Sequence, residues 1–360
     1  MKEVLFIAAG TRGAKRIGNL FQPYIPIRDQ LCVQHVMESA INATTIDKIY
    51  IWGDPPTLKT ILHTTLSKAA RNNIEVIIAQ EKNNFVSSFL FTYLLFLSHR
   101  LGQSVADDVL AGDEPGPLQW DLLREFGQDE AIANLSVNLI LSDTPLIKPY
   151  EIDTMITHKN PNADLIFGRT VKHSMDRVMS GIPESFRYDL AVKNYYNYIL
   201  KEQSVDLIVN SFMAGKPLRI PGYVWNFAGH LFHNRTIIEG GRFNLKKIKN
   251  NVIFFKSIFS KNHLADVERS GSSKLNYYQK LKVFSFLVRS YFAIINNNKK
   301  AQKKFRDLSV LEEKIKSLTN CTIEYQISDC FGPALDIDTE YEIEYIDRFF
   351  ESLSRGMNPT

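Results

Sequence analysis

Residues 4–18 read VLFIAAGTRGAKRIG, and this stretch decides the expected fold. The apolar run at its start leads into a loop rich in glycine and in positive charge. The glycines and cations of the loop are Gly10, Arg12, Gly13, Lys15, Arg16 and Gly18. Glycine lets the backbone approach a ligand closely, successive backbone N–H groups form a concavity that binds anions, and guanidinium groups fit phosphate. The stretch predicts a β-strand followed by a loop for nucleotide phosphates, although a sharp strand-to-helix turn also uses glycine.

The segments that follow alternate between strand-like and helix-like patterns. Short runs rich in Ile, Val and Leu occur at residues 48–54, 75–80, 136–143 and 163–169. Helix-like stretches occur near residues 30–43, 56–72, 84–101 and 150–158. Apolar strands separated by helices are typical of a parallel sheet covered on both faces. We therefore expect a doubly wound, Rossmann-like α/β fold with a mostly parallel sheet, in which the glycine loop and Asp143 share the rim at the carboxyl ends of the strands.

Length and composition indicate a globular protein. The chain has 360 residues, of which 44% are hydrophobic and 23% are charged, and this suits one elaborated domain or one domain with an insertion. Its opening residues show no signal-peptide pattern. The apolar run 85–99 is shorter than the ~18–20 residues that span a bilayer, so a buried helix is expected. The cysteines, Cys32, Cys321 and Cys330, fit neither a disulfide framework nor a zinc site, and a cytoplasmic location is expected.

Positive charge is concentrated in residues 242–306. This segment contains sixteen Lys and Arg residues against two acidic residues, Asp266 and Glu268, whereas the whole chain carries a net charge of +4. The charge run is either a solvated face or a surface for anionic partners. Apolar residues at helical spacing predict a basic helix that packs on its own domain and attracts a polyanionic acceptor, with peripheral membrane contact as the alternative. No nucleic-acid-binding motif is present, so no nucleic-acid partner is expected.

Two acidic motifs are candidates for a metal site. LILSDTPLIKP (139–149) places Asp143 at the end of an expected central strand, where it either holds Mg²⁺ or caps the following turn. ALDIDTEYEIEYI (334–346) places Asp336 and Asp338 on the same side of an expected strand, since side chains alternate along a strand. The alternative for this second motif is a helix cap that begins at Thr339.

Together these stretches resemble the nucleotidyltransferases of the MobA-like, GT-A-type superfamily, in an uncharacterised subset that has a basic insertion. The motifs that carry the resemblance are AAGTRGAKRIG (8–18), QPYIPI (22–27), SDTPLI (142–147) and DIDTEYEI (336–343). The resemblance implies a nucleotidyltransferase core over residues 1–240, a basic helical insertion over 241–324 and a return to the core over 325–360.

The resemblance also implies a chemistry, in which a phosphate oxygen of a phosphorylated sugar or polyol attacks the α-phosphorus of an NTP and pyrophosphate leaves. The residues that it implies for NTP binding are Ala8, Ala9, Gly10, Thr11, Arg12, Gly13 and Gln22. Arg16 is implied to contact the β- and γ-phosphates. Asp143 and Asp338 are implied as Mg²⁺ ligands, with Asp336 as a further one. Arg16, Lys15 and Asp143 are the implied catalytic residues.

The sequence departs from the family pattern at two points. Additional residues separate the glycines of the loop from Arg16, and Gln22 stands where the family usually has a lysine facing the α-phosphate. Lys15 or Arg12 could replace that lysine, or the chain could bind a nucleotide without turnover. A glycosyltransferase that uses a nucleotide-sugar donor is a further alternative, although such an enzyme does not grip a γ-phosphate.

Overall fold

In the computed structural model of the chain, the described residues are 2–12, 16–102, 107–171, 207–219 and 321–337, together with 285, 316, 340, 342–344, 346–347 and 350. This part of the chain contains a seven-stranded sheet with the strand order β11-β9-β10-β8-β1-β6-β7. Its strands are β1 (Glu3–Ala8), β6 (Ile46–Gly53), β7 (Glu75–Gln80), β8 (Val137–Leu141), β9 (Leu165–Val171), β10 (Leu207–Gly215) and β11 (Ile323–Ser328).

The sheet is mostly parallel. β1 pairs in parallel with β6 and β8, β6 pairs in parallel with β7, and β11 pairs in parallel with β9. Only β10 runs antiparallel among these seven, against both of its neighbours, β8 and β9. The doubly wound α/β class and the five predicted strands are therefore confirmed. β10 was not predicted, because the polar residues Asn210 and Ser211 interrupt its apolar run, although both are buried.

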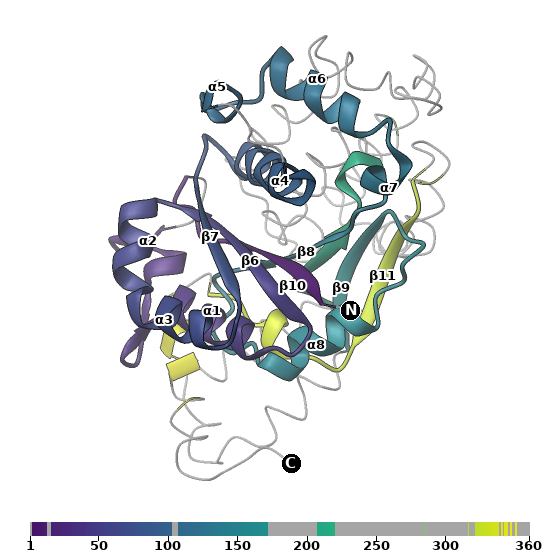
Figure 1. Ribbon diagram of the computed structural model, residues 1–360. Helices are drawn as coiled ribbons and strands as arrows, with labels where there is room; N and C mark the ends of the chain where they lie inside the picture. The colour runs from purple at the N-terminus through teal and green to yellow at the C-terminus, as the bar shows by residue number, and fades with distance from the viewer. Residues whose placement is uncertain are drawn as a thin grey trace.

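Helices cover both faces of the sheet (Figure 1). The helices on one face are α1 (Cys32–Asn42), α2 (Pro55–Ile61), α3 (His63–Arg71) and α8 (Pro149–Thr157). Those on the other face are α4 (Phe85–Leu101), α5 (Asp107–Leu110), α6 (Pro117–Phe126) and α7 (Glu130–Ala133). The predicted helix 56–72 is two helices, because Leu62, which is fully buried, has non-helical backbone angles and separates them.

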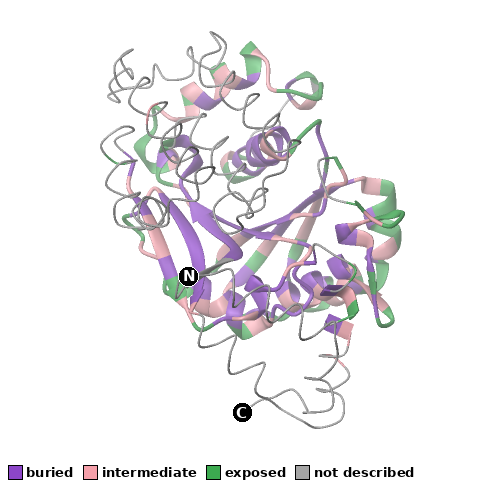
Figure 2. Cartoon of the chain, turned by 180° about the vertical axis from the view of Figure 1, so that it is seen from behind, coloured by how far each residue is buried: buried purple, intermediate pink, exposed green. Residues whose placement is uncertain are grey.

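The core lies in two layers, one on each side of the sheet, because side chains alternate along each strand. Leu5 and Ile7 of β1 face α1 and α8, whereas Phe6 lies on the opposite side in an aromatic cluster with Tyr50 and α4. Figure 2 shows the buried strands between these layers and α4 as a mostly buried helix. The prediction of a buried helix at 85–99 is thus confirmed, and none of the described helices is long and apolar enough to cross a bilayer.

Short elements connect β1 to α1. They are β2 (Arg16–Ile17), β3 (Leu20–Phe21), the 3₁₀ helix Gln22–Tyr24, β4 (Pro26–Ile27) and β5 (Gln30–Leu31). β2 and β3 form one two-stranded hairpin, and β4 and β5 form another. Gly18 lies in the first hairpin turn with φ of 59°, a conformation that favours glycine. These elements carry residues 16–31 along the rim of the sheet before α1 begins.

Candidate functional site

Parallel pairing brings the predicted loops together at one rim of the sheet. Beyond the end of β8, Ser142 donates both its backbone N–H and its hydroxyl to the carbonyl oxygen of Ala8, at 3.1 Å and 2.6 Å. On the other side of β1, Ala9 donates its N–H to the carbonyl oxygen of Trp52 at 3.0 Å. The glycine loop therefore lies between the segment after β6 and the segment that contains Asp143. The predicted shared rim is confirmed.

The backbone amides of the glycine loop bind an internal carboxylate. Glu81, directly after β7, is 6% exposed. Its Oε2 accepts the N–H of Thr11 at 2.5 Å and that of Arg12 at 3.1 Å, and its Oε1 accepts the Thr11 hydroxyl at 2.8 Å. A Cβ added at Gly10 would lie 2.7 Å from Glu81 Oε2, so a larger residue here would displace that carboxylate oxygen. The loop is an anion-binding concavity, and the anion that it holds in the structure is the carboxylate of Glu81.

Further polar groups surround the loop. The hydroxyl of Tyr24 donates to the carbonyl oxygen of Ala9 at 3.4 Å. Burial raises the pKa of Tyr24 to about 12, and the negative charges of Glu81 and Asp54 raise it as well. Asp54 follows β6 and caps α2 by accepting the N–H of Thr57 at 3.1 Å. Two carboxylates thus lie near the glycine loop, and a bound triphosphate would need positive charge here to offset them.

Arg12 is engaged with the connection between α5 and α6. Its Nη1 lies 3.0 Å from Asp113 Oδ1 and donates to Asn83 Oδ1 at 3.2 Å. Both partners of the ion pair are partly exposed, so this bond contributes little to stability. Of the two cations that could replace the missing lysine, Arg12 therefore points to the α5–α6 connection, and Lys15 lies outside the described residues, as does Gly13.

A buried lysine anchors the same connection. Lys82 is 7% exposed and donates from Nζ to the carbonyl oxygens of Leu110 and Gly112, at 2.7 Å and 2.8 Å. Its ammonium also lies 4.4 Å from the centre of the Phe91 ring. Burial lowers the pKa of Lys82, and the negative charge of Asp113 acts in the opposite direction. The segment 110–113 is thus held beside the glycine loop by cations on both sides.

Arg16 lies in the β2–β3 hairpin that follows the loop. Its guanidinium is 4.3 Å from the centre of the Phe21 ring, on the paired strand, and the residue is exposed. The hairpin therefore orients the guanidinium by stacking while leaving it accessible to solvent, which suits a phosphate contact. Its predicted role in NTP binding stays a prediction.

Gln22 joins the N-terminal segment to the C-terminal motif. Its side chain is 8% exposed, and Nε2 donates to the backbone carbonyl oxygen of Ile337 at 2.6 Å. The N–H of Ile337 in turn donates to the backbone carbonyl oxygen of Asp143 at 3.0 Å. Three motifs that are far apart in the sequence therefore meet at one residue, Ile337, which lies between Asp336 and Asp338.

The environment of Asp143 is defined by the start of α1 and by the C-terminal motif. Burial raises the pKa of the Cys32 thiol, and the negative charge of Asp143 raises it further. The carboxylate of Asp143 therefore lies close enough to the first residue of α1 for the two groups to interact. Thr144, the next residue, is fully buried and donates its hydroxyl to the carbonyl oxygen of Leu141 at 3.1 Å. The turn after β8 is thus fixed by its own threonine.

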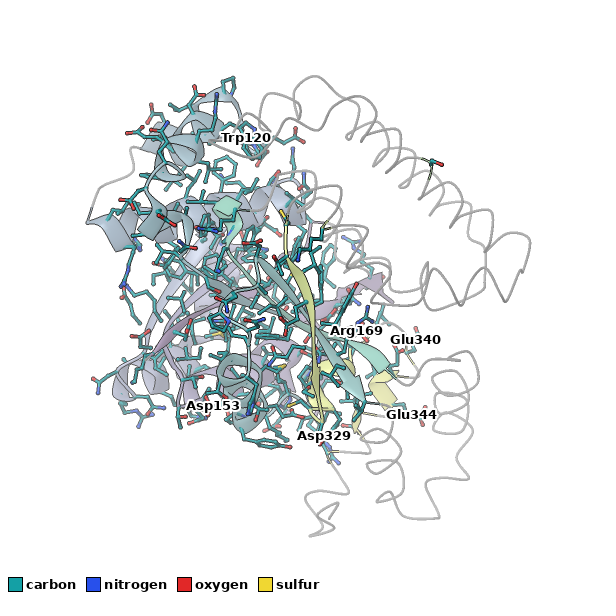
Figure 3. The ribbon with its side chains drawn as sticks, turned by 90° about the vertical axis from the view of Figure 1, so that its right-hand side faces the viewer. Trp120, Asp153, Arg169, Asp329, Glu340 and Glu344 are labelled. Atoms are coloured by element: carbon teal, nitrogen blue, oxygen red, sulfur yellow. The ribbon has the colours of Figure 1, made fainter. Side chains whose placement is uncertain are left out.

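The C-terminal motif is not the strand that the sequence predicted. The strand β11 ends at Ser328, the 3₁₀ helix Gly332–Ala334 follows, and residues 335–337 belong to no strand. Pro333 lacks an N–H for strand pairing, and Leu335 donates to the carbonyl oxygen of Gly332 within the turn at 3.2 Å. The segment from 329 to 337, here named the return segment, is held by single hydrogen bonds to β9, α8, the 3₁₀ helix Gln22–Tyr24 and the turn after β8. Figure 3 labels Asp329 at its start.

Only two of the three predicted metal ligands lie within the described residues. Asp143 and Asp336 lie on the two segments that the Ile337–Asp143 backbone bond joins. Asp338 and Thr339 lie outside the described residues, so neither the proposed ligand nor the alternative helix cap is seen. Within the described part of the chain, no three His, Cys, Asp or Glu side chains are grouped closely enough to hold a metal ion.

Sequence reasoning missed Glu81 and Glu151. Glu81 directly follows the expected strand 75–80, so its position on the shared rim was a usable signal. Glu151 lies in the first turn of α8, is fully buried, and accepts the N–H of Gly332 at 3.0 Å. No local pattern connects Glu151 with a glycine of the return segment, because the contact forms only when the fold is complete.

No protein-family model and no curated protein matches the chain. Solved structures with an overall likeness include a hypothetical transferase from Thermus thermophilus, with 11% identity and a TM-score of 0.47 over 95% of this chain and 100% of that chain. A 4-diphosphocytidyl-2C-methyl-D-erythritol synthase from Anaerococcus prevotii has 9% identity and a TM-score of 0.39 over 97% and 96%. A CMP:2-keto-3-deoxy-manno-octonic acid synthetase complexed with CTP has 12% identity and a TM-score of 0.33 over 72% and 86%. The α/β class of the chain rests on its own strand order and directions.

Proposed function

We propose that this chain is a Mg²⁺-dependent nucleotidyltransferase that moves a nucleoside monophosphate from an NTP to a phosphorylated sugar or polyol and releases pyrophosphate. The observation that carries the proposal is the meeting of three motifs at Ile337. Gln22 binds its carbonyl oxygen at 2.6 Å, and the carbonyl oxygen of Asp143 binds its N–H at 3.0 Å. The glycine loop lies on the same rim, next to Ser142. A phosphate loop and acidic residues on one rim are the parts that phosphoryl-type transfer requires.

The residues have distinct proposed roles. The loop from Ala8 to Gly13 binds the nucleotide, and Arg16 offers a forked donor to the terminal phosphates. Asp143 and Asp336 offer carboxylate oxygens, the donor type that Mg²⁺ prefers, and Asp338 is proposed as the third. When bound, Mg²⁺ would neutralise phosphate charge. The protein's own contribution is to hold the phosphates and the acceptor in line, since positioning and charge supply most of the rate in such transfers.

A nucleotide-binding protein without turnover is the second candidate, and Gln22 favours it. Its buried amide is bound to the backbone of the return segment, so this position serves the fold and supplies no cation to an α-phosphate. Arg12 is paired with Asp113. Turnover therefore depends on whether Lys15, or Arg12 released from Asp113, neutralises that phosphate.

Pyrophosphate release separates these candidates. Each of the four common NTPs is incubated with the protein, Mg²⁺ and a panel of sugar and polyol phosphates, and pyrophosphate is measured. We expect release with one preferred base, dependent on both Mg²⁺ and acceptor. NTP binding without release under all conditions contradicts the transferase proposal and supports the binding protein. Hydrolysis of a nucleotide-sugar without NTP consumption would indicate a glycosyltransferase.

A further inference from the structure

Glu151 is a buried carboxylate with partners on two separate segments. It occupies the first turn of α8 and is fully buried. Its Oε2 accepts the N–H of Lys148 at 2.9 Å, which closes the cap of its own helix. Its Oε1 accepts the N–H of Gly332 at 3.0 Å, across 181 residues of sequence. One carboxylate thus ties the start of α8 to the return segment.

Position 332 has no room for a residue larger than glycine. A Cβ at this position would lie 2.4 Å from Glu151 Oε2, 2.7 Å from the Cα of Ile147 and 2.7 Å from the carbonyl oxygen of Leu146. Two of these three atoms belong to backbone, which cannot move aside as a side chain can. The glycine therefore allows the return segment to pack closely against residues 146–147, in the connection from β8 to α8 that also contains Asp143.

A helix cap alone does not account for this carboxylate. Taking a carboxylate fully out of water carries a large cost unless its oxygens are bonded, and the cap satisfies only one of the two oxygens. Burial raises the pKa of Glu151 to about 7, and the backbone N–H groups of Gly332, Lys148 and Phe331 and the charge of Lys148 oppose that rise. The amides of the return segment thus favour the ionised form, but burial outweighs them and the pKa stays raised. The neighbouring titratable groups are Tyr150 and Cys330, each with a pKa raised mainly by burial and further by Glu151.

The return segment reaches the candidate site a few residues beyond this contact. The Thr170 hydroxyl holds the carbonyl oxygen of Cys330 at 2.5 Å, just before Gly332. Ile337 then bonds to Asp143 and Gln22 and packs in an apolar cluster with Leu335. The upstream end of this short span is therefore held by Thr170 and by Glu151, and its downstream end by Asp143 and Gln22.

We propose that Glu151 is a positioning residue, whose carboxylate holds the return segment so that Asp336 lies beside Asp143. The proposal rests on the proposed function for its catalytic consequence, but the anchoring itself does not depend on it. Glu151 touches no substrate in this proposal and acts through the backbone of Gly332. Loss of the Glu151–Gly332 hydrogen bond should therefore weaken Mg²⁺ binding at Asp143 and Asp336. It should leave the nucleotide contacts of the glycine loop unchanged.

The test compares Glu151→Gln with Asp153→Asn in the full chain. Glutamine keeps the size of the side chain but turns one acceptor into a donor that faces a backbone N–H. Asp153 lies on the same helix and is labelled in Figure 3, and it binds Thr44 and Thr45 without contacting the return segment. Hydrogen exchange of the apo protein is followed by mass spectrometry. We expect the amides of Gly332 and Ile337 to exchange about tenfold faster in Glu151→Gln and at the wild-type rate in Asp153→Asn.

Kinetics then test the catalytic consequence. In Glu151→Gln we expect the Mg²⁺ concentration for half-maximal rate to rise about tenfold, with the KM for NTP within about twofold of wild type. The anchoring role is contradicted if the amides of Gly332 and Ile337 exchange at the wild-type rate in Glu151→Gln. It is also contradicted if their exchange rate increases equally in Asp153→Asn. If Glu151→Gln does not fold, Glu151→Asp, which keeps the charge but shortens the reach, is measured in the same way. The two proposals can fail separately. If the wild-type protein releases no pyrophosphate, the proposed function is refuted. If amide exchange still differs between the two variants as expected, the anchoring role of Glu151 is nevertheless supported.

Discussion

Gln22 and Ile337 are separated by 315 positions in the chain and joined by one hydrogen bond of 2.6 Å. The donor is a buried side-chain amide and the acceptor is a backbone carbonyl oxygen. The same residue, Ile337, donates its N–H to Asp143. The residue between the two predicted metal ligands Asp336 and Asp338 is therefore held through both its N–H and its carbonyl oxygen.

Gln22→Leu should destabilise the protein and loosen the return segment. The substitution removes the donor and leaves the carbonyl oxygen of Ile337 buried with one partner fewer, at a cost of about 1–3 kcal/mol in the free energy of unfolding. Urea unfolding measures the change. Gln128→Leu, in an exposed turn, is the control and should change stability by less than about 0.5 kcal/mol. Equal stability of Gln22→Leu and wild type would show that this bond contributes nothing net.

Asp143→Asn should abolish transfer and preserve the fold. The bond from Ile337 to this residue uses the backbone carbonyl oxygen, which the substitution keeps. A neutral amide is a poor ligand for Mg²⁺, so a rate loss of about a hundredfold or more is expected. Pyrophosphate release and thermal unfolding are measured on the same preparation. A fall in melting temperature large enough to explain the lost rate would instead identify Asp143 as a structural cap.

Arg16→Ala should weaken NTP binding more than NMP binding. The guanidinium is exposed and stacked on Phe21, from where it is proposed to reach the terminal phosphates, which an NMP lacks. Loss of charge-assisted hydrogen bonds predicts a rise in the Kd for NTP of about tenfold or more. Titration calorimetry with both nucleotides measures it, and Arg16→Lys should recover part of the affinity. Equal weakening for NTP and NMP would remove Arg16 from the phosphate site.

Gly10 and Glu81 should be energetically coupled. A Cβ at Gly10 would meet Glu81 Oε2 at 2.7 Å and push the carboxylate away from the amide of Thr11. Gly10→Ala is therefore expected to cost about 1–3 kcal/mol in the wild type and much less in Glu81→Ala, where nothing is displaced. A double-mutant cycle measured by urea unfolding gives the coupling. Additive effects of the two substitutions would contradict the contact.

The stability of the protein should fall as the pH rises through neutrality, because of Glu151. Burial raises the pKa of this carboxyl from 4.5 to about 7 in the folded chain, whereas the unfolded chain has the ordinary value. The native state binds the proton more tightly, so this contribution is complete below about pH 4.5 and is lost as the pH rises through about 7, on the order of 3 kcal/mol in total.

Urea unfolding across this pH range measures the contribution, and Glu151→Gln should remove it. Asp153→Asn is the control. Hydrogen bonds from Thr44 and Thr45 lower the pKa of Asp153, so its contribution has the opposite sign and is lost as the pH falls. A wild-type pH slope that persists in Glu151→Gln would show that another group is responsible.

The sequence predicted the central architecture because its signal is local. Apolar runs such as 75–80 and 136–143 became parallel strands, and the rim shared by the glycine loop and Asp143 followed from parallel pairing alone. The antiparallel strand β10 escaped prediction because Asn210 and Ser211 make its pattern ambiguous. Both are buried, so tertiary contacts and not the local pattern decide that strand.

The candidate site was only partly predictable. Residue types at strand ends indicated Asp143 and the glycine loop, but not that Glu81 would occupy the loop's amides. The expected strand at Asp336 was wrong, since Pro333 and the contact of Gly332 with Glu151 impose a turn just before it. Contacts between residues so far apart in the sequence leave no local pattern. Such long-range contacts hold the return segment in place.

The position of the return segment has a consequence for protein synthesis. The glycine loop and Gln22 leave the ribosome before Ile337, whose bonds to Gln22 and Asp143 can form only after β11 has been translated. Folding units form from the N-terminus as translation proceeds, and pairings across long stretches of chain form last. A nascent chain can thus build the central strands while its candidate site still lacks one wall. The described part of the site is completed only when β11 pairs with β9 and brings the return segment to Gln22 and Asp143.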